Sequence, residues 1–261
     1  DDLRAFDNIL KNPNGILLVT GPTGSGKSTT LYTALSELNN EDVNIITVED
    51  PVEANIDGIN QVQVNPKAEL TFASALRSIL RQDPDIIMIG EIRDGETAQI
   101  AVQASITGHL VVSTLHTNSA AATISRLEDM GIESYLLADS LVGIIAQRLV
   151  RRLCPNCKKE HYATEDEKKV MNIDENGDIL IYEATGCEKC DNTGYTGRIG
   201  IYEILTVTQN IKNLISRRAT ADEVARAAQT EGMHTLRQSA TKLVLEGTTS
   251  YKEMLRTTFE N

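Results

Sequence analysis

The sequence predicts an α/β fold built on a largely parallel, doubly wound sheet. Short apolar runs typical of buried strands alternate with segments of helical periodicity from the N-terminus through residue 153. Several of these runs end in glycine, carboxylate or histidine residues. Because the carboxyl ends of parallel strands are where such sheets place ligands, the same pattern predicts a binding site at that edge.

The expected elements follow in chain order. Strands are expected within residues 16–20, 43–48, 83–94 and 109–118, with an edge strand or hairpin within residues 59–64. Helices are expected at residues 1–11 and 27–38, after a Thr71 cap, from an Asp94 cap to Gly108, and as two amphipathic helices across residues 120–147.

A glycine-rich motif begins where the first strand ends. Residues 21–28 match the P-loop pattern Gly-x-x-x-x-Gly-Lys-Ser. Glycines let backbone N–H groups turn inward around an anion, and the N-terminus of the next helix adds partial positive charge. We expect Lys27 to reach the outer phosphates of a nucleoside triphosphate and Ser28 to ligate Mg²⁺. The expected nucleotide-binding residues are Gly21, Pro22, Thr23, Gly24, Ser25, Gly26, Lys27, Ser28 and Thr29. A glycine-rich turn that binds nothing is the alternative, and the flanking strand and helix count against it.

Composition limits the partners of this site. The 261 residues include 25 basic and 37 acidic residues, for a net charge of −12, and no Trp. Nucleic acid is not an expected ligand, because phosphates require a basic face and single strands require aromatic stacking. No apolar run approaches the length of a membrane span and the N-terminus does not resemble a signal peptide, so we expect a cytosolic protein. About fourteen residues precede the first strand, and we therefore expect a fragment of a longer protein.

Two carboxylates end candidate parallel strands. Glu49 follows the apolar run at 43–48, and Glu91 ends another in the manner of a Walker B element, with Gly90 where an acidic residue usually stands. Phosphoryl transfer to water needs a metal, a carboxylate for the metal or the water, and cations for the developing charge. We assign Glu91 to Mg²⁺ and the water and Glu49 to polarising the water, and which of them is the general base stays open. A solvated loop carboxylate is the alternative for Glu91.

Two histidines and two arginines are further candidates. His109 and His116 flank the run at 109–118, and a cap or core role is the ordinary interpretation of a lone histidine. His116 stands at the carboxyl end of the run, where it can donate a hydrogen bond to a γ-phosphate and sense hydrolysis. Arg77 and Arg81 lie four residues apart on one helix face, where two cations ordinarily just remain solvated.

Four cysteines form two Cys-x-x-Cys pairs, Cys154 with Cys157 and Cys187 with Cys190. Each pair can chelate one tetrahedral metal, and two pairs supply a complete shell with no open position. A structural Zn²⁺ is therefore expected, with unliganded buried thiols or a redox pair as the alternatives. The metal would stabilise a subdomain too small to bury its own core.

The predicted architecture thus has three parts. An ATPase core covers residues 1–153, a zinc-binding subdomain covers residues 154–206, and an all-α subdomain covers residues 207–261. Apolar residues at helical spacing place four short helices in the last part, within residues 207–217, 221–230, 236–246 and 251–258.

Five ordered motifs resemble the secretion ATPases, the hexameric motors of type II secretion and type IV pilus assembly. They are the P-loop, Thr-Val-Glu-Asp-Pro-Val-Glu at 47–53, Leu-Arg-Gln-Asp-Pro-Asp at 80–85, Gly-Glu-Ile-Arg-Asp at 90–94, and the histidine-bearing run at 108–118. In that family the stretches are called Walker A, Asp box, Walker B and His box, and Gly90 before Glu91 fits its Walker B. The four-cysteine segment is similar to that of the secretion and assembly members.

The resemblance implies a RecA-like core and ATP hydrolysis between the subunits of a homo-hexamer. It also implies assembly of pilins or pseudopilins through an inner-membrane platform protein, a place at the inner face of the cytoplasmic membrane, and an N-terminal domain before this chain. Arg77, Arg81, Arg93 and Arg198 are similar in position to arginines that contact nucleotide at subunit interfaces. A nucleotide-binding regulator with little turnover and a DNA-translocating motor are the alternative functions.

Overall fold

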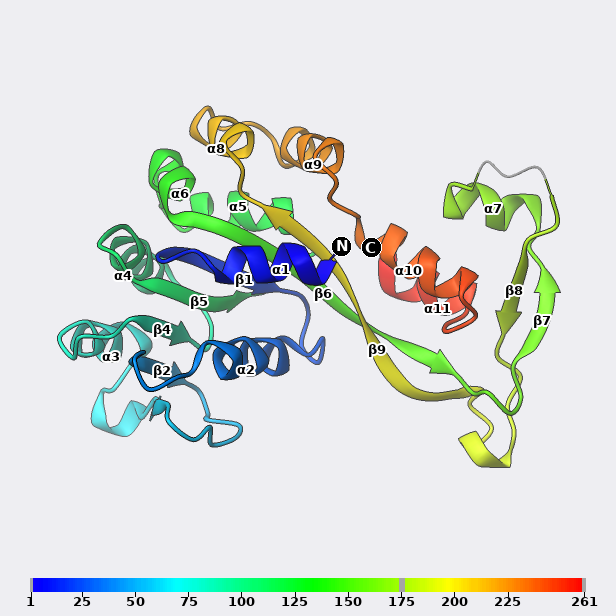
Figure 1. Ribbon diagram of the computed structural model, residues 1–261, viewed down its shortest axis with the longest axis horizontal. Helices are drawn as coiled ribbons and strands as arrows, with labels where there is room; N and C mark the ends of the chain where they lie inside the picture. Colours follow the sequence, from blue (N-terminus) through cyan, green and yellow to red (C-terminus); the bar gives the residue numbers. More distant parts are fainter. Residues whose placement is uncertain (1, 174–176, 260–261) are drawn as a thin grey trace. The chain divides into compact units, whose positions relative to one another are not determined.

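The computed structural model describes residues 2–173 and 177–259 (Figure 1). By their internal contacts the residues form two compact units. The first comprises residues 1–146 and 204–233, and the second comprises residues 147–203 and 234–261. Each unit is therefore built from two separate stretches of the chain.

A mostly parallel sheet forms the centre of the first unit, and its last two strands continue along the chain into residues of the second unit. Its strands are β1 (Gly15–Thr20), β2 (Ile45–Glu49), β3 (Asn60–Gln63), β4 (Ile86–Ile89), β5 (Leu110–Leu115), β6 (Leu141–Leu153) and β9 (Tyr195–Thr206), in the order β3-β2-β4-β5-β1-β6-β9. The neighbouring pairs from β3 to β6 are all parallel. Every residue of β1, β2, β4 and β5 is buried, as expected for strands covered on both faces. The predicted α/β fold is confirmed.

Helices cover both faces of this sheet. They are α1 (Asp2–Leu10), α2 (Lys27–Leu38), η1 (Pro66–Ala68), α3 (Phe72–Ile79), α4 (Gly95–Ile106), α5 (Ala120–Asp129), α6 (Ser134–Ser140), α8 (Gln209–Ser216) and α9 (Ala221–Thr230). The chain crosses the sheet in one direction from β1 to β2 and in the other from β3 through β4 to β5. Because such crossovers are right-handed, α2 covers one face and α3 and α4 cover the other. The sheet is therefore doubly wound, as predicted.

The predicted capping residues begin two of these helices. The Thr71 hydroxyl accepts a hydrogen bond from the Ser74 N–H at 3.1 Å at the start of α3. At the start of α4, the Asp94 carboxylate accepts one from the Thr97 N–H at 2.8 Å. Asp94, which lies three residues beyond Glu91, thereby fixes the start of α4.

The second helix predicted across residues 120–147 ends earlier than expected. Helix α6 stops at Ser140, and the next residues form β6, which pairs in parallel with β1. Residues 142, 144 and 145 are β-branched and favour a strand over a helix, and Gly143 between them disfavours a helix. A Cβ on Gly143 would lie 2.5 Å from Ile9 Cδ1, so glycine lets α1 cover this strand closely. The helix prediction for residues 141–147 was wrong, and β9 was not predicted.

The second unit contains a small two-stranded sheet and three α-helices among its described residues. Its elements are β7 (Lys159–Tyr162), α7 (Glu165–Met171), β8 (Leu180–Glu183), η2 (Glu188–Cys190), α10 (Leu236–Leu245) and α11 (Tyr251–Thr258). Strands β7 and β8 are antiparallel, and α10 and α11 pack on each other and on β8. Ile181, Ala240, Val244 and Met254 are fully buried and form the core of this unit.

All four helices predicted in the tail are present, but they are divided between the units. Helices α8 and α9 belong to the first unit, where α8 packs on α6 and α9 packs on α5. Helices α10 and α11 belong to the second. Each pair buries its apolar stripe on different neighbours. The three-part division at residues 153 and 206 stays a prediction.

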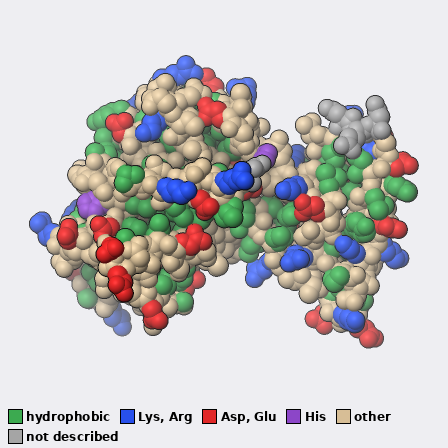
Figure 2. Space-filling model, viewed as in Figure 1, with side chains coloured by type: hydrophobic (Ala, Val, Ile, Leu, Met, Phe, Trp, Pro, Cys, Tyr) green, Lys and Arg blue, Asp and Glu red, His purple; other side chains and the backbone are tan. Residues whose placement is uncertain are grey.

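Most of the net negative charge belongs to the first unit, which contains 23 of the 37 acidic residues but only 12 of the 25 basic ones, for a net charge of −11. Figure 2 shows a group of Asp and Glu side chains on the visible face of this unit. Such a surface repels a nucleic-acid backbone. Over the described residues, no helix combines the length and the apolar character needed to cross a membrane.

Candidate functional site

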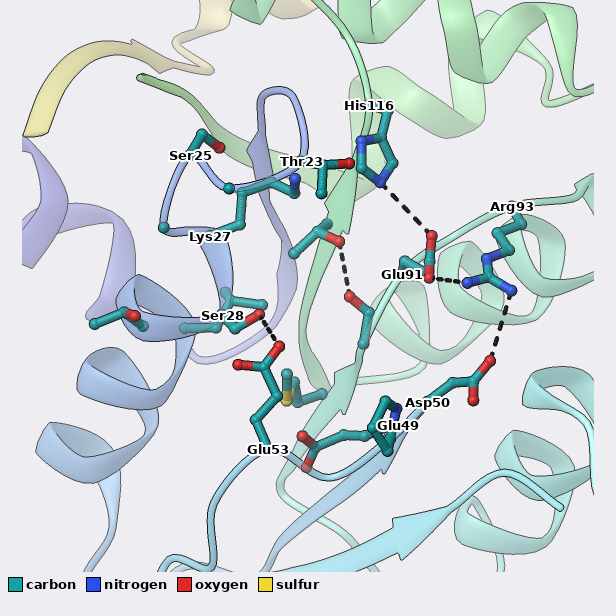
Figure 3. A pocket seen from close by; sticks show the side chains of 18 of the residues that line it. Thr23, Ser25, Lys27, Ser28, Glu49, Asp50, Glu53, Glu91, Arg93 and His116 are labelled. Carbon is teal, nitrogen blue, oxygen red and sulfur yellow. Dashed lines mark hydrogen bonds and ion pairs between the residues drawn. The ribbon is translucent and has the colours of Figure 1, made fainter. Parts of the chain in front are cut away.

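A cavity of about 450 Å³ opens at the carboxyl ends of the parallel strands (Figure 3). The P-loop and the start of α2 line one side, and residues at the ends of β2, β4 and β5 line the other. The predicted site residues on its wall are Thr23, Gly24, Ser25, Gly26, Lys27, Ser28, Thr29, Glu49, Glu91, Arg93 and His116. Four motifs that are far apart in the sequence therefore meet in one place.

The P-loop has the backbone that its glycines predict. Gly24 and Gly26 have φ angles of 76° and 87°, in the left-handed region that glycine adopts without strain. Gly26 is the N-cap of α2 and provides no side-chain oxygen, which leaves the first N–H groups of the helix available to an anion. The Lys27 ammonium donates to the carbonyl oxygens of Gly21 at 2.8 Å and Pro22 at 3.1 Å. Lys27 is thus held over its own loop.

Ser28 and Glu53 connect the start of α2 to the loop after β2. The Ser28 hydroxyl donates to Glu53 Oε1 at 3.0 Å, and both residues line the cavity. Two oxygen-bearing side chains therefore stand side by side, and oxygen is the ligand type that Mg²⁺ prefers. Glu53 is the last residue of the motif at 47–53, and no role was predicted for it from the sequence.

Glu49 is a buried carboxylate held by three donors. Its residue is 2% exposed, and burying a charge this deeply is costly unless hydrogen bonds replace water. The Thr47 hydroxyl donates to Oε1 at 2.6 Å and the Gln61 amide donates to Oε1 at 3.1 Å. The Tyr32 hydroxyl donates to Oε2. These contacts fix one orientation of the carboxylate in the cavity wall.

Glu91 lies between a cation and a histidine. Arg93 donates to Glu91 Oε1 through Nη2, and its Nη1 lies 3.6 Å from Asp50 Oδ2. His116 Nε2 lies 3.7 Å from Glu91 Oε2 (Figure 3). The hydrogen bond to Glu91 is the main cause that raises the pKa of Arg93. The predicted carboxylate, arginine and histidine thus form one cluster at the cavity.

The other predicted arginines, Arg77, Arg81 and Arg198, are not among the residues that line this cavity. Arg77 forms an ion pair with Glu96 of α4 at 2.5 Å, and both side chains are more than half exposed. Arg81 is exposed and does not line the cavity. Arg198 belongs to the second unit. Their predicted contact with a nucleotide at a subunit interface stays a prediction.

The two histidines occupy different environments. His109 Nδ1 lies 2.9 Å from the carbonyl oxygen of Ala104, near the end of α4. This contact agrees with the cap role considered for His109. His116 lies just beyond β5 at the cavity, as its place at the end of the predicted strand implied.

Sequence reasoning missed the partners of Glu49. Thr47 lies two residues before Glu49 on the same strand, so period-two alternation could have identified it. Tyr32 lies four residues after Ser28 on the same helix, so helical spacing could have identified it. Gln61 carries no such local signal, because the parallel register of β2 and β3 brings it opposite Thr47.

The four cysteines come together in the second unit. Their sulfur atoms all lie within 4.8 Å of one another. The Sγ atoms of Cys154 and Cys187 are 4.0 Å apart, those of Cys157 and Cys190 are 3.8 Å apart, and those of Cys187 and Cys190 are 3.7 Å apart. Four sulfurs at about 2.3 Å from a tetrahedral Zn²⁺ are separated by about 3.8 Å. The cluster therefore fits the predicted ion.

The surroundings of the thiols favour negative charge on two of them. A backbone hydrogen bond from Asn156 is the main cause that lowers the pKa of Cys154 to about 6. Burial acts to raise the pKa of Cys190, but backbone hydrogen bonds from Cys187 and Gly194 outweigh it and lower that pKa. Burial and the neighbouring thiols raise the pKa of Cys187 to about 11. N–H groups directed at sulfur are what a thiolate ligand of a metal requires.

Comparisons of the sequence with known proteins show that this chain is similar to secretion proteins. The profile of a family described as "Type II/IV secretion system protein" matches residues 1–256. "Type II secretion system ATPase E" of Vibrio cholerae serotype O1 is 52% identical over 256 residues, which cover 98% of this chain and 51% of that protein. "Type IV pilus assembly ATPase PilB" of Acinetobacter baylyi is 52% identical over 259 residues, which cover 98% of this chain and 45% of that protein. The chain spans about half the length of the curated relatives it matches.

A solved structure agrees with the fold. The structure described as "Pilus Retraction Motor PilT and Bound ADP" matches with a TM-score of 0.74 and 30% sequence identity, over 100% of this chain and 65% of that one. Its α/β architecture with a mostly parallel sheet is thus shared along the whole chain.

Proposed function

The chain belongs to the type II/IV secretion system protein family, and from this membership we propose that it hydrolyses ATP as part of a motor for secretion or pilus assembly. The observation that carries the proposal is the meeting of Lys27 and Ser28 with Glu49 and Glu91 in one cavity. Phosphoryl transfer to water needs a phosphate-binding cation, an ion-binding oxygen and a carboxylate near the water. Secretion and pilus assembly both stay open, because relatives of both kinds are equally similar.

ATP is the proposed substrate. The N–H groups at the start of α2 bind the phosphates, and the glycines of the loop let the backbone approach them. Lys27 exchanges its hydrogen bonds to the Gly21 and Pro22 carbonyls for bonds to the outer phosphates. The lysine needs little movement for this exchange, because it already lies over the loop.

Ser28 and Glu91 are the proposed holders of Mg²⁺. Both line the cavity with oxygen atoms, which suits a hard divalent cation, and Glu53 adds a third oxygen-bearing group beside Ser28. Bound Mg²⁺ neutralises the charge that develops on the β- and γ-phosphates. The Ser28 hydroxyl can keep its hydrogen bond to Glu53 when its oxygen ligates the ion, because the bond uses the hydroxyl proton and leaves the oxygen lone pairs available.

Glu49 is the proposed group that polarises the attacking water. Its carboxylate is fixed by three donors and faces the same cavity as Lys27. Glu91 also orients the water, and His116 beside it donates a hydrogen bond toward the γ-phosphate and senses its loss. Either carboxylate can serve as the general base.

A structural Zn²⁺ is proposed for the second unit. Cys154, Cys157, Cys187 and Cys190 would all hold it as thiolates, and the spacing of their sulfurs supports this ligand set. A shell of four thiolates leaves no position for water or substrate. The ion would therefore stabilise the fold around the cysteines without taking part in hydrolysis.

The assembly of the whole protein is also a proposal. We infer a homo-hexamer in which Arg93, together with Arg77, Arg81 and Arg198, contacts nucleotide at subunit interfaces and stabilises the developing charge. Its proposed partner is a platform protein of the inner membrane, and its proposed place is the cytoplasmic face of that membrane. The names of the relatives, secretion ATPase and pilus assembly ATPase, support a role within such an apparatus.

Steady-state hydrolysis of Mg-ATP tests the proposed activity. We expect wild-type protein to release phosphate, and Lys27→Ala and Glu91→Gln each to lose about 100-fold in kcat, because each removes a group that stabilises the transition state. Lys67→Ala and Glu37→Gln are matched controls, since both residues are exposed and lie outside the cavity. Equal activity in wild type, Lys27→Ala and Glu91→Gln would refute the motor function.

Two other outcomes point to the alternative functions. Tight ATP binding by wild-type protein without turnover indicates a nucleotide-binding regulator. A rate that DNA stimulates and that collapses as salt rises indicates a DNA-translocating motor.

A further inference from the structure

Tyr32 connects the nucleotide-binding helix to the Glu49 carboxylate. It lies on α2, one helical turn after Ser28, and its side chain is half-buried. Its hydroxyl donates to Glu49 Oε2 and accepts from the Glu53 backbone N–H at 3.1 Å. One hydroxyl thus contacts both the last residue of β2 and the loop that follows it.

The three donors of Glu49 are not equivalent. Thr47 and Gln61 both donate to Oε1, and both belong to the edge of the sheet around β2. Among the described residues, Tyr32 is the group that donates to Oε2. Tyr32 is therefore the one contact through which α2 controls the second oxygen of the carboxylate.

Tyr32 has no place on the cavity wall, whereas Glu49 does. Any effect of Tyr32 on hydrolysis must therefore act through the groups that it touches. Ser28 donates to the Glu53 side chain one turn earlier on the same helix face, so α2 contacts the loop at two successive points. A change at the phosphate-binding end of α2 is in this way linked mechanically to Glu49.

We propose that Tyr32 is a positioning residue for hydrolysis, which holds the Glu49 carboxylate in the orientation that polarises water and ties that orientation to the nucleotide-binding end of α2. The inference rests on the proposed ATPase function and adds to it how Glu49 is oriented. Burial, followed by the contact with Glu49, raises the pKa of Tyr32, so the phenol keeps its proton and remains a donor at neutral pH.

The test compares Tyr32→Phe with wild type in hydrolysis and in binding. Phenylalanine keeps the ring and removes the hydroxyl, so we expect kcat to fall about 10-fold through misorientation of Glu49. Affinity for a fluorescent ADP analogue is expected to stay unchanged, because Lys27 and Ser28 are untouched. The melting temperature is expected to fall, because the buried Glu49 carboxylate loses one of its donors. Tyr135→Phe is the matched control, since Tyr135 is 60% exposed and lies outside the cavity.

A double-mutant cycle separates positioning from a merely structural role. If Tyr32 acts through Glu49, Tyr32→Phe lowers kcat in wild type but has no further effect in a Glu49→Gln background. An unchanged kcat in Tyr32→Phe overturns the inference, and so does an equal fold-loss in both backgrounds. A fall in nucleotide affinity equal to the fall in kcat/KM also overturns it. These outcomes overturn the role of Tyr32 in a protein whose wild type hydrolyses ATP. Wild-type protein without turnover overturns the proposed function itself, so the two failures are distinguishable.

Discussion

The backbone of Gly90 lies against that of Glu49. A Cβ at position 90 would stand 3.3 Å from Glu49 Cα and 3.3 Å from the Val48 carbonyl oxygen. The parallel pairing of β2 and β4 produces this approach, and the Gly90 N–H donates to that same carbonyl at 2.8 Å. Glycine before Glu91 therefore lets the ends of the two strands, with their carboxylates, come together at the cavity.

Replacing Gly90 is expected to separate these strand ends. Gly90→Ala should lower kcat about 5-fold, because the neighbouring backbone must yield by a few tenths of an ångström, and Gly90→Asp should lower it further. Hydrolysis of Mg-ATP, compared with affinity for ADP, is the measurement. Gly177→Ala is the control, because a Cβ there meets no atom within 4 Å. If Gly90→Ala keeps the kcat of the wild type, the close approach of the two strand ends does not matter for hydrolysis.

The four-cysteine cluster predicts metal-dependent stability. Freshly purified, reduced protein should contain about one Zn per chain by elemental analysis. Removing the metal with a chelator, or replacing Cys154 with Ser, should lower the melting temperature, because metal binding contributes to folding free energy. Nucleotide affinity should change little, since the cluster lies outside the cavity. Protein that is free of zinc when freshly prepared and unoxidised would contradict this prediction.

Local patterns in the sequence were sufficient for the elements that carry the site. The P-loop, the buried strands before Glu49 and Glu91, and the Asp94 cap are each specified within a few neighbouring residues, and all were predicted correctly. The segment from residue 141 was not predicted correctly, because a short apolar run after a helix fits the period of a helix and that of a strand equally well. Its pairing with β1 and the close cover of Gly143 by Ile9 decide its structure, and both are long-range contacts.

The candidate site likewise combines residues found by local motifs with residues brought in by long-range contacts. Motifs identified the groups that face the cavity, but the residues that hold them come from other elements. Gln61 reaches Glu49 only because β3 pairs with β2, and Arg93 reaches Asp50 only because β4 lies beside β2. A single sequence does not contain these pairings, since register depends on the packing of the whole sheet.

The contact between Gly143 and Ile9 predicts a loss of stability on adding one methyl group. Gly143→Ala places a Cβ within 2.9 Å of three Ile9 carbon atoms, and overpacking of this kind costs about 1–3 kcal/mol. Denaturant unfolding of the first unit measures the effect. In an Ile9→Ala background the same substitution should cost less, because the space is then open. Equal costs in the two backgrounds would mean that α1 does not pack on β6 in this way.

The buried carboxylate of Glu253 leads us to expect that the second unit loses stability in acid. The residue is 1% exposed, and its carboxylate accepts hydrogen bonds from Arg151 at 2.7 Å and Arg256 at 2.6 Å. Burial acts to raise its pKa, but these hydrogen bonds outweigh burial and lower the pKa to about 2. The unfolded chain, with a pKa of about 4.3, binds this proton more readily. The ionised Glu253 carboxylate therefore contributes about 3 kcal/mol to the free energy of unfolding. This contribution is fully present above about pH 4.5 and is lost as the pH drops toward 2.

Denaturant unfolding from pH 7 down to pH 2 measures this contribution. Glu253→Gln should be less stable than wild type at pH 7, and the difference should shrink as the pH falls through the range from about 4.5 to 2. Glu246→Gln is the matched control, because Glu246 is an exposed carboxylate at the end of α10. Acid also protonates the cysteines in all three proteins, so only the difference between the proteins reports on Glu253. A Glu253→Gln difference that stays constant across this range would mean that the ionised carboxylate is not what Arg151 and Arg256 stabilise.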